Sequence, residues 1–229
     1  MAPEEQLRRS WDANAAAWTA AVRGGAIPSR TAGTDGAIVD AIAALRPERV
    51  LDVGCGEGWL ARRLRTELGC EVVGIDGSAP LIAAAGAADP DGSYRVLSYE
   101  RAIAEPAALG GPHAVAVCNF ALLGEALAPL LGALGSALAP GGALLIQTLH
   151  PWTACSDQPY RDGWREETFR DFGAGWQPMP WYFRTLASWL AAAGTAGLAL
   201  TGCREPADPV SGRPLSLLLQ LARAAEAPS

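Results

Sequence analysis

Three glycines at alternate positions, Gly54, Gly56 and Gly58, follow an apolar run that contains the carboxylate of Asp52. The stretch reads VLDVGCGEGWLARRL over residues 50–64. Because glycine lacks a Cβ atom and adopts positive φ readily, this spacing lets another group approach the backbone closely. The pattern therefore predicts a ligand-binding turn between a strand and a helix, and the first question is which ligand the turn accepts.

Two common glycine-rich turns differ from this pattern. The dinucleotide fingerprint G-x-G-x-x-G places its third glycine where this chain carries the bulky Trp59. The phosphate loop G-x-x-x-x-G-K-[ST] requires a lysine, and the sequence contains none. The remaining pattern, D-x-G-x-G-x-G, indicates a turn that presents its backbone to a small, non-phosphorylated ligand.

A second carboxylate, Asp76, comes 22 residues after Gly54, at the end of the next apolar run. A carboxylate at a strand end can accept hydrogen bonds from both hydroxyls of a ribose. A glycine turn followed by such an acid fits either NAD or an adenosyl ligand. The alternative for Asp76 alone is a solvated turn residue or a helix cap.

Apolar runs typical of strands alternate with alanine- and leucine-rich stretches typical of helices. We expect strands at residues 49–53, 71–76, 94–98, 114–119 and 143–149, and helices at 58–68, 80–88 and 124–138. Ser78 is expected to cap the second of these helices, with Pro80 in its first turn. This alternation predicts a parallel sheet with helices on both faces, where ligands bind at the carboxyl ends of the strands.

The chain resembles class I S-adenosylmethionine-dependent methyltransferases in four segments, which occur in the order VLDVGCGEGWLARRL, VVGIDGS, AVCNFALL and LAPGGALLIQTLHP. The resemblance covers about residues 45–150. It implies a Rossmann-like α/β fold with a seven-stranded, mostly parallel sheet, and S-adenosylmethionine as cofactor with S-adenosylhomocysteine as product. Beyond residue 184, a helix at 184–194 and strands at 198–202 and 214–223 resemble the end of the family's fold.

The resemblance also implies a set of cofactor-binding residues: Trp18, Arg30, Asp52, Gly54, Cys55, Gly56, Asp76, Gly77, Ser78, Ser98, Tyr99, Asn119 and Phe120. Asp76 would hold the ribose. Arg30 would pair with the carboxylate of the methionine portion, or else be a plain surface charge. Trp18 shares a helix face with Trp11, an arrangement that usually indicates packing.

One position departs from the family's pattern. Members usually carry an acidic residue at the start of the fourth strand, where this chain has His113. We expect His113 to be a partly exposed turn residue without a catalytic role.

Residues 150–184 form a connection that is too long and too aromatic for an ordinary turn, and they contain four of the eight tryptophans. Long connections are usually either functional or disordered, and aromatic content argues against disorder. We expect a lid that stacks on a flat, apolar acceptor. Its expected substrate-binding residues are Trp152, Tyr160, Trp164, Trp181 and Arg184. The alternative is that these aromatics form a satellite core.

His150 is the expected general base. It ends the fifth strand, next to Pro151, which favours an extended backbone. In this fold that position lies near the transferring methyl group, and an imidazole can accept a proton near neutral pH. The alternative is that His150 only orients the acceptor or the lid, since many methyl transfers need no base.

The composition limits the remaining possibilities. The formal charge is −6, the isoelectric point is about 5.0 and all 18 basic residues are arginine, which disfavours a nucleic-acid partner. The first residues lack the apolar core of a signal peptide, and no run approaches the roughly 20 apolar residues of a membrane span. Five scattered cysteines suggest neither a disulfide framework nor a metal site. We expect a cytoplasmic protein, and its oligomeric state stays open.

Together these observations predict an N-terminal helical cap over residues 1–35 and a methyltransferase domain over 36–229, with 150–184 as the substrate insertion. The predicted reaction moves a methyl group to oxygen or nitrogen of a small, planar aromatic or heteroaromatic acceptor. Alternatives are a methyltransferase for a macromolecule and a non-catalytic S-adenosylmethionine-binding module. A nicotinamide-dependent oxidoreductase is disfavoured because Trp59 stands where the dinucleotide fingerprint requires its third glycine.

Overall fold

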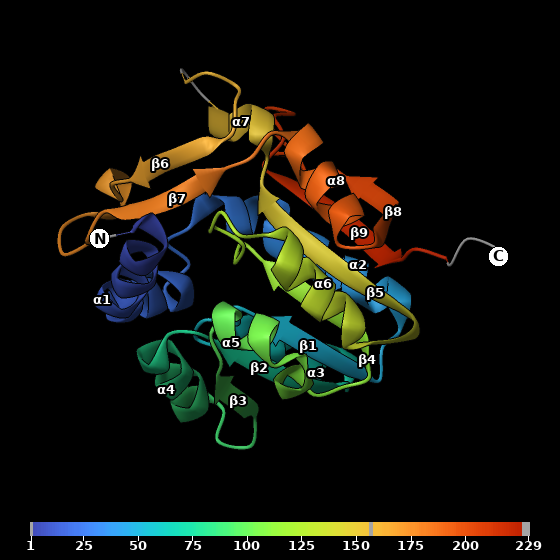
Figure 1. Ribbon diagram of the computed structural model, residues 1–229. Coiled ribbons are helices and arrows are strands. Elements are labelled where there is room, and N and C mark those ends of the chain that lie inside the picture. The colour runs from blue at the N-terminus through green and yellow to red at the C-terminus, as the bar shows by residue number, and fades with distance from the viewer. Residues whose placement is uncertain (1, 156–157, 226–229) are drawn as a thin grey trace.

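The computed structural model describes residues 2–155 and 158–225, in which strands alternate with helices (Figure 1). The strands are β1 (Arg49–Val53), β2 (Glu71–Asp76), β3 (Ser93–Val96), β4 (His113–Asn119), β5 (Leu138–Leu149), β6 (Gly163–Glu167), β7 (Met179–Phe183), β8 (Leu198–Arg204) and β9 (Ser216–Arg223). The α-helices are α1 (Pro3–Arg23), α2 (Asp35–Leu45), α3 (Trp59–Leu68), α4 (Ala79–Ala88), α5 (Tyr99–Ala104), α6 (Ala128–Ser136), α7 (Pro151–Cys155) and α8 (Leu186–Thr195). Shorter π or 3-10 turns are η1 (Arg30–Thr34), η2 (Pro106–Leu109) and η3 (Arg170–Phe172).

Seven strands form one sheet in the order β3-β2-β1-β4-β5-β9-β8. The first five strands of the chain pair in parallel, and β9 is antiparallel to both β5 and β8. This topology confirms the expected Rossmann-like, mostly parallel sheet. Strand order reverses at β1, which lies between β2 and β4, so the carboxyl ends of β1 and β4 border the crevice where such folds bind ligands.

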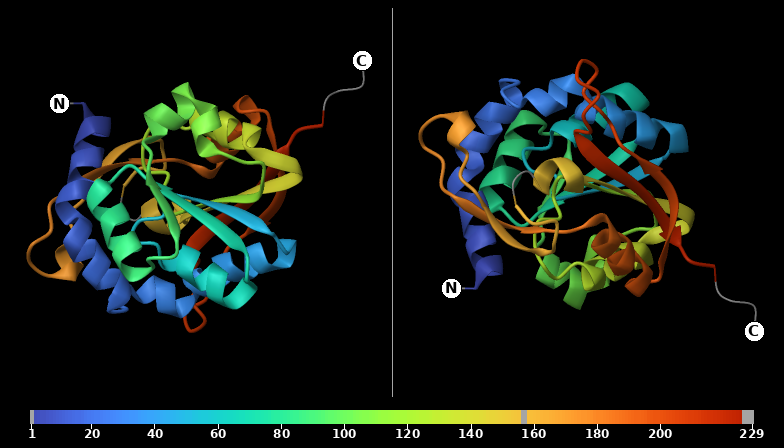
Figure 2. Two further views of the ribbon diagram at one scale, coloured as in Figure 1. Left: turned by 90° about the horizontal axis from the view of Figure 1, so that it is seen from below. Right: turned by 90° about the horizontal axis from the view of Figure 1, so that it is seen from above.

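Helices cover both faces of the sheet (Figure 2). Alternate residues of each central strand point to opposite faces, so neighbours such as Val50 and Leu51 belong to different apolar layers. Helices α5, α6 and α8 pack on the layer of Leu51, and α2 and α3 pack on the layer of Val50. In the described ranges, no helix combines the length and the apolar character needed to cross a membrane.

Two segments lie outside this three-layer arrangement. Strands β6 and β7 form their own two-stranded antiparallel sheet, called here the β6–β7 hairpin (residues 163–183). Helix α1 lies beside β7 and α4 (Figure 1). Its fully buried Asn14 fixes it to the hairpin, because the Nδ2 group donates to Gln177 O at 2.9 Å and Oδ1 accepts from Gln177 N at 2.8 Å.

The structure corrects three local expectations. Ser98 does not belong to β3 but caps α5, accepting a hydrogen bond from Arg101 N at 3.3 Å. Ser78 occupies the capping position of α4 without a side-chain bond. His113 is 1% exposed, whereas partial exposure was expected. The strand β4 begins one residue earlier than expected and includes His113, and the Nε2 atom of His113 lies 3.1 Å from Leu109 O. Burial lowers the pKa of His113.

Candidate functional site

A cavity of about 410 Å³ lies at the carboxyl ends of β1, β2 and β4. The turns that follow these strands form one side of it, and α1 together with the β6–β7 hairpin forms the other. Its size falls within the roughly 300 to 1,000 Å³ of most small-molecule sites. The crevice predicted from the strand order is therefore a cavity, and α1 and the hairpin cover it.

The three glycines of the turn after β1 have different neighbours, although all three have positive φ. A Cβ on Gly54 would lie 2.8 Å from Tyr99 Oη, and one on Gly58 would lie 2.8 Å from Tyr94 Cε1. These two glycines therefore make room for protein atoms. A Cβ on Gly56 would have only Trp18 Nε1 within 4 Å, at 3.8 Å, so Gly56 is where the turn opens toward the cavity.

Asp76 ends β2 and lines the cavity. Its two oxygens accept backbone hydrogen bonds from Gly56 N at 2.9 Å and Ser78 N at 2.8 Å. Burial raises the pKa of Asp76, and these two hydrogen bonds oppose the rise. Because no cation pairs with Asp76 among the described residues, its carboxylate retains acceptor capacity for a ligand.

Asp52 does not line the cavity, contrary to the expectation from the motif. It lies inside β1, paired with Gly74 of β2 and Val117 of β4, and is 1% exposed. Its Oδ2 atom has no hydrogen-bond partner in the part of the chain that the structure describes. Burial, and then the charge of Asp76, raise the pKa of Asp52 to about 7.

A pH-dependent cost of folding follows from this burial. A carboxyl group whose pKa is raised in the folded state binds its proton more tightly there, so its contribution to stability falls as pH rises from about 4 to about 7. We expect Asp52→Asn to be more stable than the wild type at pH 8, by at most about 4 kcal/mol, with the advantage shrinking toward pH 4. Urea unfolding at both pH values measures this. If Asp52→Asn and the wild type were equally stable at pH 8, Asp52 would not be a buried charge that lacks a compensating partner.

All other residues expected at the cofactor line the cavity: Trp18, Arg30, Gly54, Cys55, Gly56, Asp76, Gly77, Ser78, Ser98, Tyr99, Asn119 and Phe120. Asn119 ends β4, and its Oδ1 accepts from Gln147 Nε2 at 2.9 Å. The structure thus brings these residues together, and their contact with the cofactor stays a prediction.

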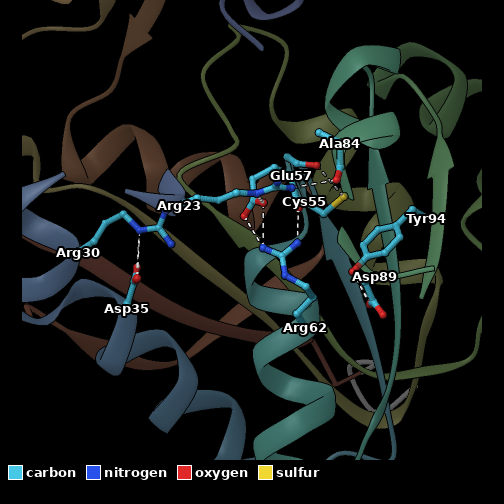
Figure 3. A network of polar contacts seen from close by, with 10 residues as sticks. Arg23, Arg30, Asp35, Cys55, Glu57, Arg62, Ala84, Asp89 and Tyr94 are labelled. Carbon is cyan, nitrogen blue, oxygen red and sulfur yellow. Dashed lines mark hydrogen bonds and ion pairs between the residues drawn. The ribbon is translucent and has the colours of Figure 1, made fainter. Parts of the chain in front are cut away.

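Arg30 has protein partners that the sequence reasoning did not include (Figure 3). Its Nε donates to Asp35 Oδ1 at 2.9 Å, and its guanidinium carbon lies 4.2 Å from the centre of the Trp59 ring. The charge of Arg30 is therefore already paired, which weakens the case for a bond to the methionine carboxylate.

His150 lies outside the cavity. It is buried after β5, and its Nε2 lies 2.8 Å from Glu205 Oε1. The residue before it, Leu149, lines the cavity and is 41% exposed. Since successive residues of a strand point in opposite directions, the position facing the cavity belongs to Leu149. This placement speaks against His150 as the general base.

Of the expected acceptor residues, only Trp181 lines the cavity. Trp152 in α7 is 74% exposed, and Tyr160 is 48% exposed with its hydroxyl accepting from Leu186 N at 2.9 Å. Both side chains therefore lie away from the cavity, on the outer surface of the insertion. Residues 156–157, between them, lie outside the described residues.

Trp164 and Arg184 lie outside the cavity as well and hold the loop after β4. The Trp164 indole donates to Glu125 Oε2 at 3.2 Å. The buried Arg184 donates to Gly124 O at 2.7 Å and to Glu125 O at 2.6 Å. These two residues support one wall of the cavity from behind.

Sequence reasoning missed several lining residues, which come from α1 and the hairpin: Glu4, Leu7, Arg8, Phe169, Phe172 and Met179. Leu7, Phe169 and Met179 form a small apolar cluster of their own. Leu7 lies four residues before Trp11 and eleven before Trp18, so the helix face noted for the two tryptophans continues to Leu7. That extended face was the available signal on α1. Phe169 and Phe172 belong to the aromatic content that marks residues 150–184, and no comparable signal marks Met179.

Comparisons of sequence agree with this geometry. The chain matches the model of the methyltransferase domain family over residues 33–200. It is 40% identical over 114 residues to a ubiquinone biosynthesis O-methyltransferase of Nitrosococcus oceani, a match that covers 47% of this chain and 46% of that protein. The chain thus aligns with about half the length of that curated relative.

Solved structures share the fold. An S-adenosylmethionine-dependent methyltransferase from Mesorhizobium loti superimposes with a TM-score of 0.61 and 28% identity, over 83% of this chain and 100% of that one. A 1,6-didemethyltoxoflavin-N1-methyltransferase from Burkholderia thailandensis, solved with S-adenosylhomocysteine, gives a TM-score of 0.65 at 19% identity, over 98% and 92% of the two chains. The family model, which takes in most of the chain, shows that this protein belongs to the methyltransferase domain family.

Proposed function

We propose that the protein transfers a methyl group from S-adenosylmethionine to an oxygen or nitrogen atom of a small, planar, apolar acceptor. One observation carries the proposal: a single cavity extends from the glycine turn and Asp76 to an aromatic wall formed by α1 and the hairpin. In this proposal residues 1–35 cap the cofactor, and residues 150–184 cover the acceptor.

The residues around the turn fit the cofactor. Gly56 leaves open space where a side chain would stand, and Asp76 offers a carboxylate that has no cationic partner within residues 2–155 and 158–225. Ser78, which is 3% exposed, lines the cavity as well. A ribose with two hydroxyl donors would use the acceptor capacity that the protein leaves free on Asp76.

When bound, S-adenosylmethionine supplies a sulfonium-activated methyl group. The contribution of the chain is then to position the acceptor and to exclude water, since methyl transfer depends on alignment of the reacting atoms. Trp11, Phe169 and Trp181 provide apolar surface for a flat acceptor. Because His150 lies outside the cavity, the proposal requires an acceptor that presents an available lone pair, such as a phenolate oxygen or a ring nitrogen.

A two-step experiment tests the proposal. Calorimetry with S-adenosylmethionine and S-adenosylhomocysteine first measures binding of the cofactor. Transfer of a labelled methyl group to a panel of phenols and nitrogen heterocycles, detected by mass spectrometry, then measures turnover. Phenols come first because the curated relative is named as an O-methyltransferase. Absence of binding would reject the proposal, and binding without turnover on any acceptor would favour a non-catalytic module.

Trp181 provides a test of the aromatic wall. We expect Trp181→Ala to lower kcat/KM for the acceptor about 10- to 100-fold, because stacking and apolar burial are both lost, while the Kd of the cofactor changes less than about twofold. Trp152→Ala is the matched control, because Trp152 is largely exposed and lies outside the cavity. A loss of cofactor affinity equal to the loss of turnover would assign Trp181 to the structure of the cavity, not to the acceptor.

A further inference from the structure

A buried carboxylate next to the glycine turn is held by two arginines (Figure 3). The side chain of Glu57 is completely buried, and Glu57 follows Gly56 directly in the motif. Its Oε2 accepts from Arg23 Nε at 2.7 Å and from Arg62 Nη2 at 2.8 Å. A buried carboxylate requires such partners, since an unpaired charge in this position would be strongly unfavourable.

The two arginines join Glu57 to different parts of the molecule. Arg62 belongs to α3, five residues further along the chain, and also donates to the backbone oxygen of Glu57 at 2.6 Å. Arg23 is the last residue of α1 and also donates to Ala84 O in α4 at 3.0 Å. Arg62 therefore fixes the turn locally, whereas Arg23 connects the turn to a helix that lies outside the main sheet.

This connection bears on the cavity. Trp18, five residues before Arg23 on α1, lies next to Gly56 and lines the cavity with Glu57. Two further polar contacts of α1 lie nearer its N-terminus, where Asn14 bonds Gln177 and Glu4 Oε1 accepts from Glu125 N at 2.6 Å. Among the described residues, the pair of Arg23 and Glu57 is the ion pair that joins α1 to another element, and it acts at the C-terminal end of the helix beside the hydrogen bond from Arg23 to Ala84 O.

We propose that Glu57 is a positioning residue for the cofactor, acting as the latch that keeps α1 closed over the glycine turn through Arg23. This inference rests on the proposed function, because it assumes that S-adenosylmethionine binds against Gly56. When the latch is lost, α1 spends less time closed. The apparent affinity for the cofactor then falls in proportion to the closed fraction.

The variants should be made at Arg23, since its side chain is 42% exposed and its removal leaves Glu57 paired with Arg62. We expect Arg23→Met to raise the Kd of S-adenosylhomocysteine about tenfold, within the usual range of coupling between sites. Arg23→Lys keeps the charge and a donor for Glu57, although not the two-nitrogen geometry of the guanidinium, so it should bring the Kd back to within about threefold of the wild type. Arg9→Met is the matched control, because Arg9 lies on the same helix, pairs with Glu5 and does not line the cavity.

Hydrogen exchange gives a second readout without any ligand. In Arg23→Met, amides in the C-terminal half of α1 should exchange faster, while those of the sheet should be unchanged. In the activity assay, KM for S-adenosylmethionine should rise with kcat altered by less than about twofold, because the latch acts on closure and not on the chemical step.

The outcomes separate the two proposals. If the wild type does not bind S-adenosylhomocysteine, the proposed function fails. If the wild type binds it and Arg23→Met binds equally well, the latch is overturned. Faster exchange throughout the sheet would also overturn the latch, since it would reduce Arg23 to a general stabilising residue. A Kd that is higher in Arg23→Met, unchanged in Arg9→Met and recovered in Arg23→Lys supports the latch.

Discussion

Gly56→Val is expected to weaken S-adenosylmethionine binding more than about 100-fold, because the new side chain occupies space that the cofactor needs and strains the turn. The structure supports both reasons. Gly56 has a φ of 56°, and the position of its missing Cβ atom faces the cavity with only Trp18 nearby. Calorimetry with the purified variant, after circular dichroism has shown that it folds, measures the effect.

Gly69→Val is the control that separates loss of space for the cofactor from strain of the backbone. Gly69 has a φ of 66°, has open space around its missing Cβ and lies at the C-terminus of α3, outside the cavity. Valine there should cost about 1 to 2 kcal/mol of unfolding free energy through the same left-handed strain, with cofactor affinity unchanged. A Gly56→Val protein that binds the cofactor as the wild type does would show that the ligand does not approach this turn.

Asp76→Ala should also have a large effect, a loss of cofactor affinity of at least about 100-fold. Hydrogen bonds to a charged group contribute about 1.5 to 3 kcal/mol each, and two ribose hydroxyls would lose their acceptor. The substitution also removes the acceptor for Gly56 N and Ser78 N, so the turn itself loses support. Asp76→Asn keeps one acceptor oxygen and should therefore lose less cofactor affinity than Asp76→Ala.

The pH dependence of binding offers a check on the same residue. Burial raises the pKa of Asp76, so its carboxylate gains a proton at a higher pH than an exposed aspartate does. Affinity in the wild type should therefore fall as pH falls through that raised pKa, and Asp76→Asn should lack this decline. Glu71→Ala is the control, because Glu71 opens the same strand and is exposed. Unchanged affinity in a folded Asp76→Ala protein would remove Asp76 from the site.

The sheet and the turn after β1 could be predicted from the sequence because local signals determine them. The strands at residues 49–53 and 71–76 have the predicted bounds, since each is a short apolar run closed by a glycine or an acid. Apart from Asp52, the residues expected at the cofactor line one cavity because parallel strands bring their carboxyl ends to one edge.

The acceptor side could not be predicted in the same way. His150 and Leu149 are neighbours in sequence, and only the twist and register of β5 decide which one faces the cavity. Within residues 150–184, the aromatic content correctly marks an unusual segment. It does not reveal that β6 and β7 pair with each other, which leaves Trp164 on the supporting side and Trp181 on the cavity side.

In the proposed function the β6–β7 hairpin carries the acceptor wall, and its separate pairing makes that wall an exchangeable part. The hairpin shares no strand with the seven-stranded sheet, whereas the cofactor side of the cavity is built from turns of that sheet. Grafting a different sequence onto residues 163–183, with Gln177 kept as the partner of Asn14, would alter the surface presented to the acceptor without changing β1 and β2, which lead to Gly56 and Asp76. If the hairpin binds the acceptor as proposed, we expect acceptor selectivity to diverge, in evolution or by engineering, through this one short segment while the methyl donor stays the same.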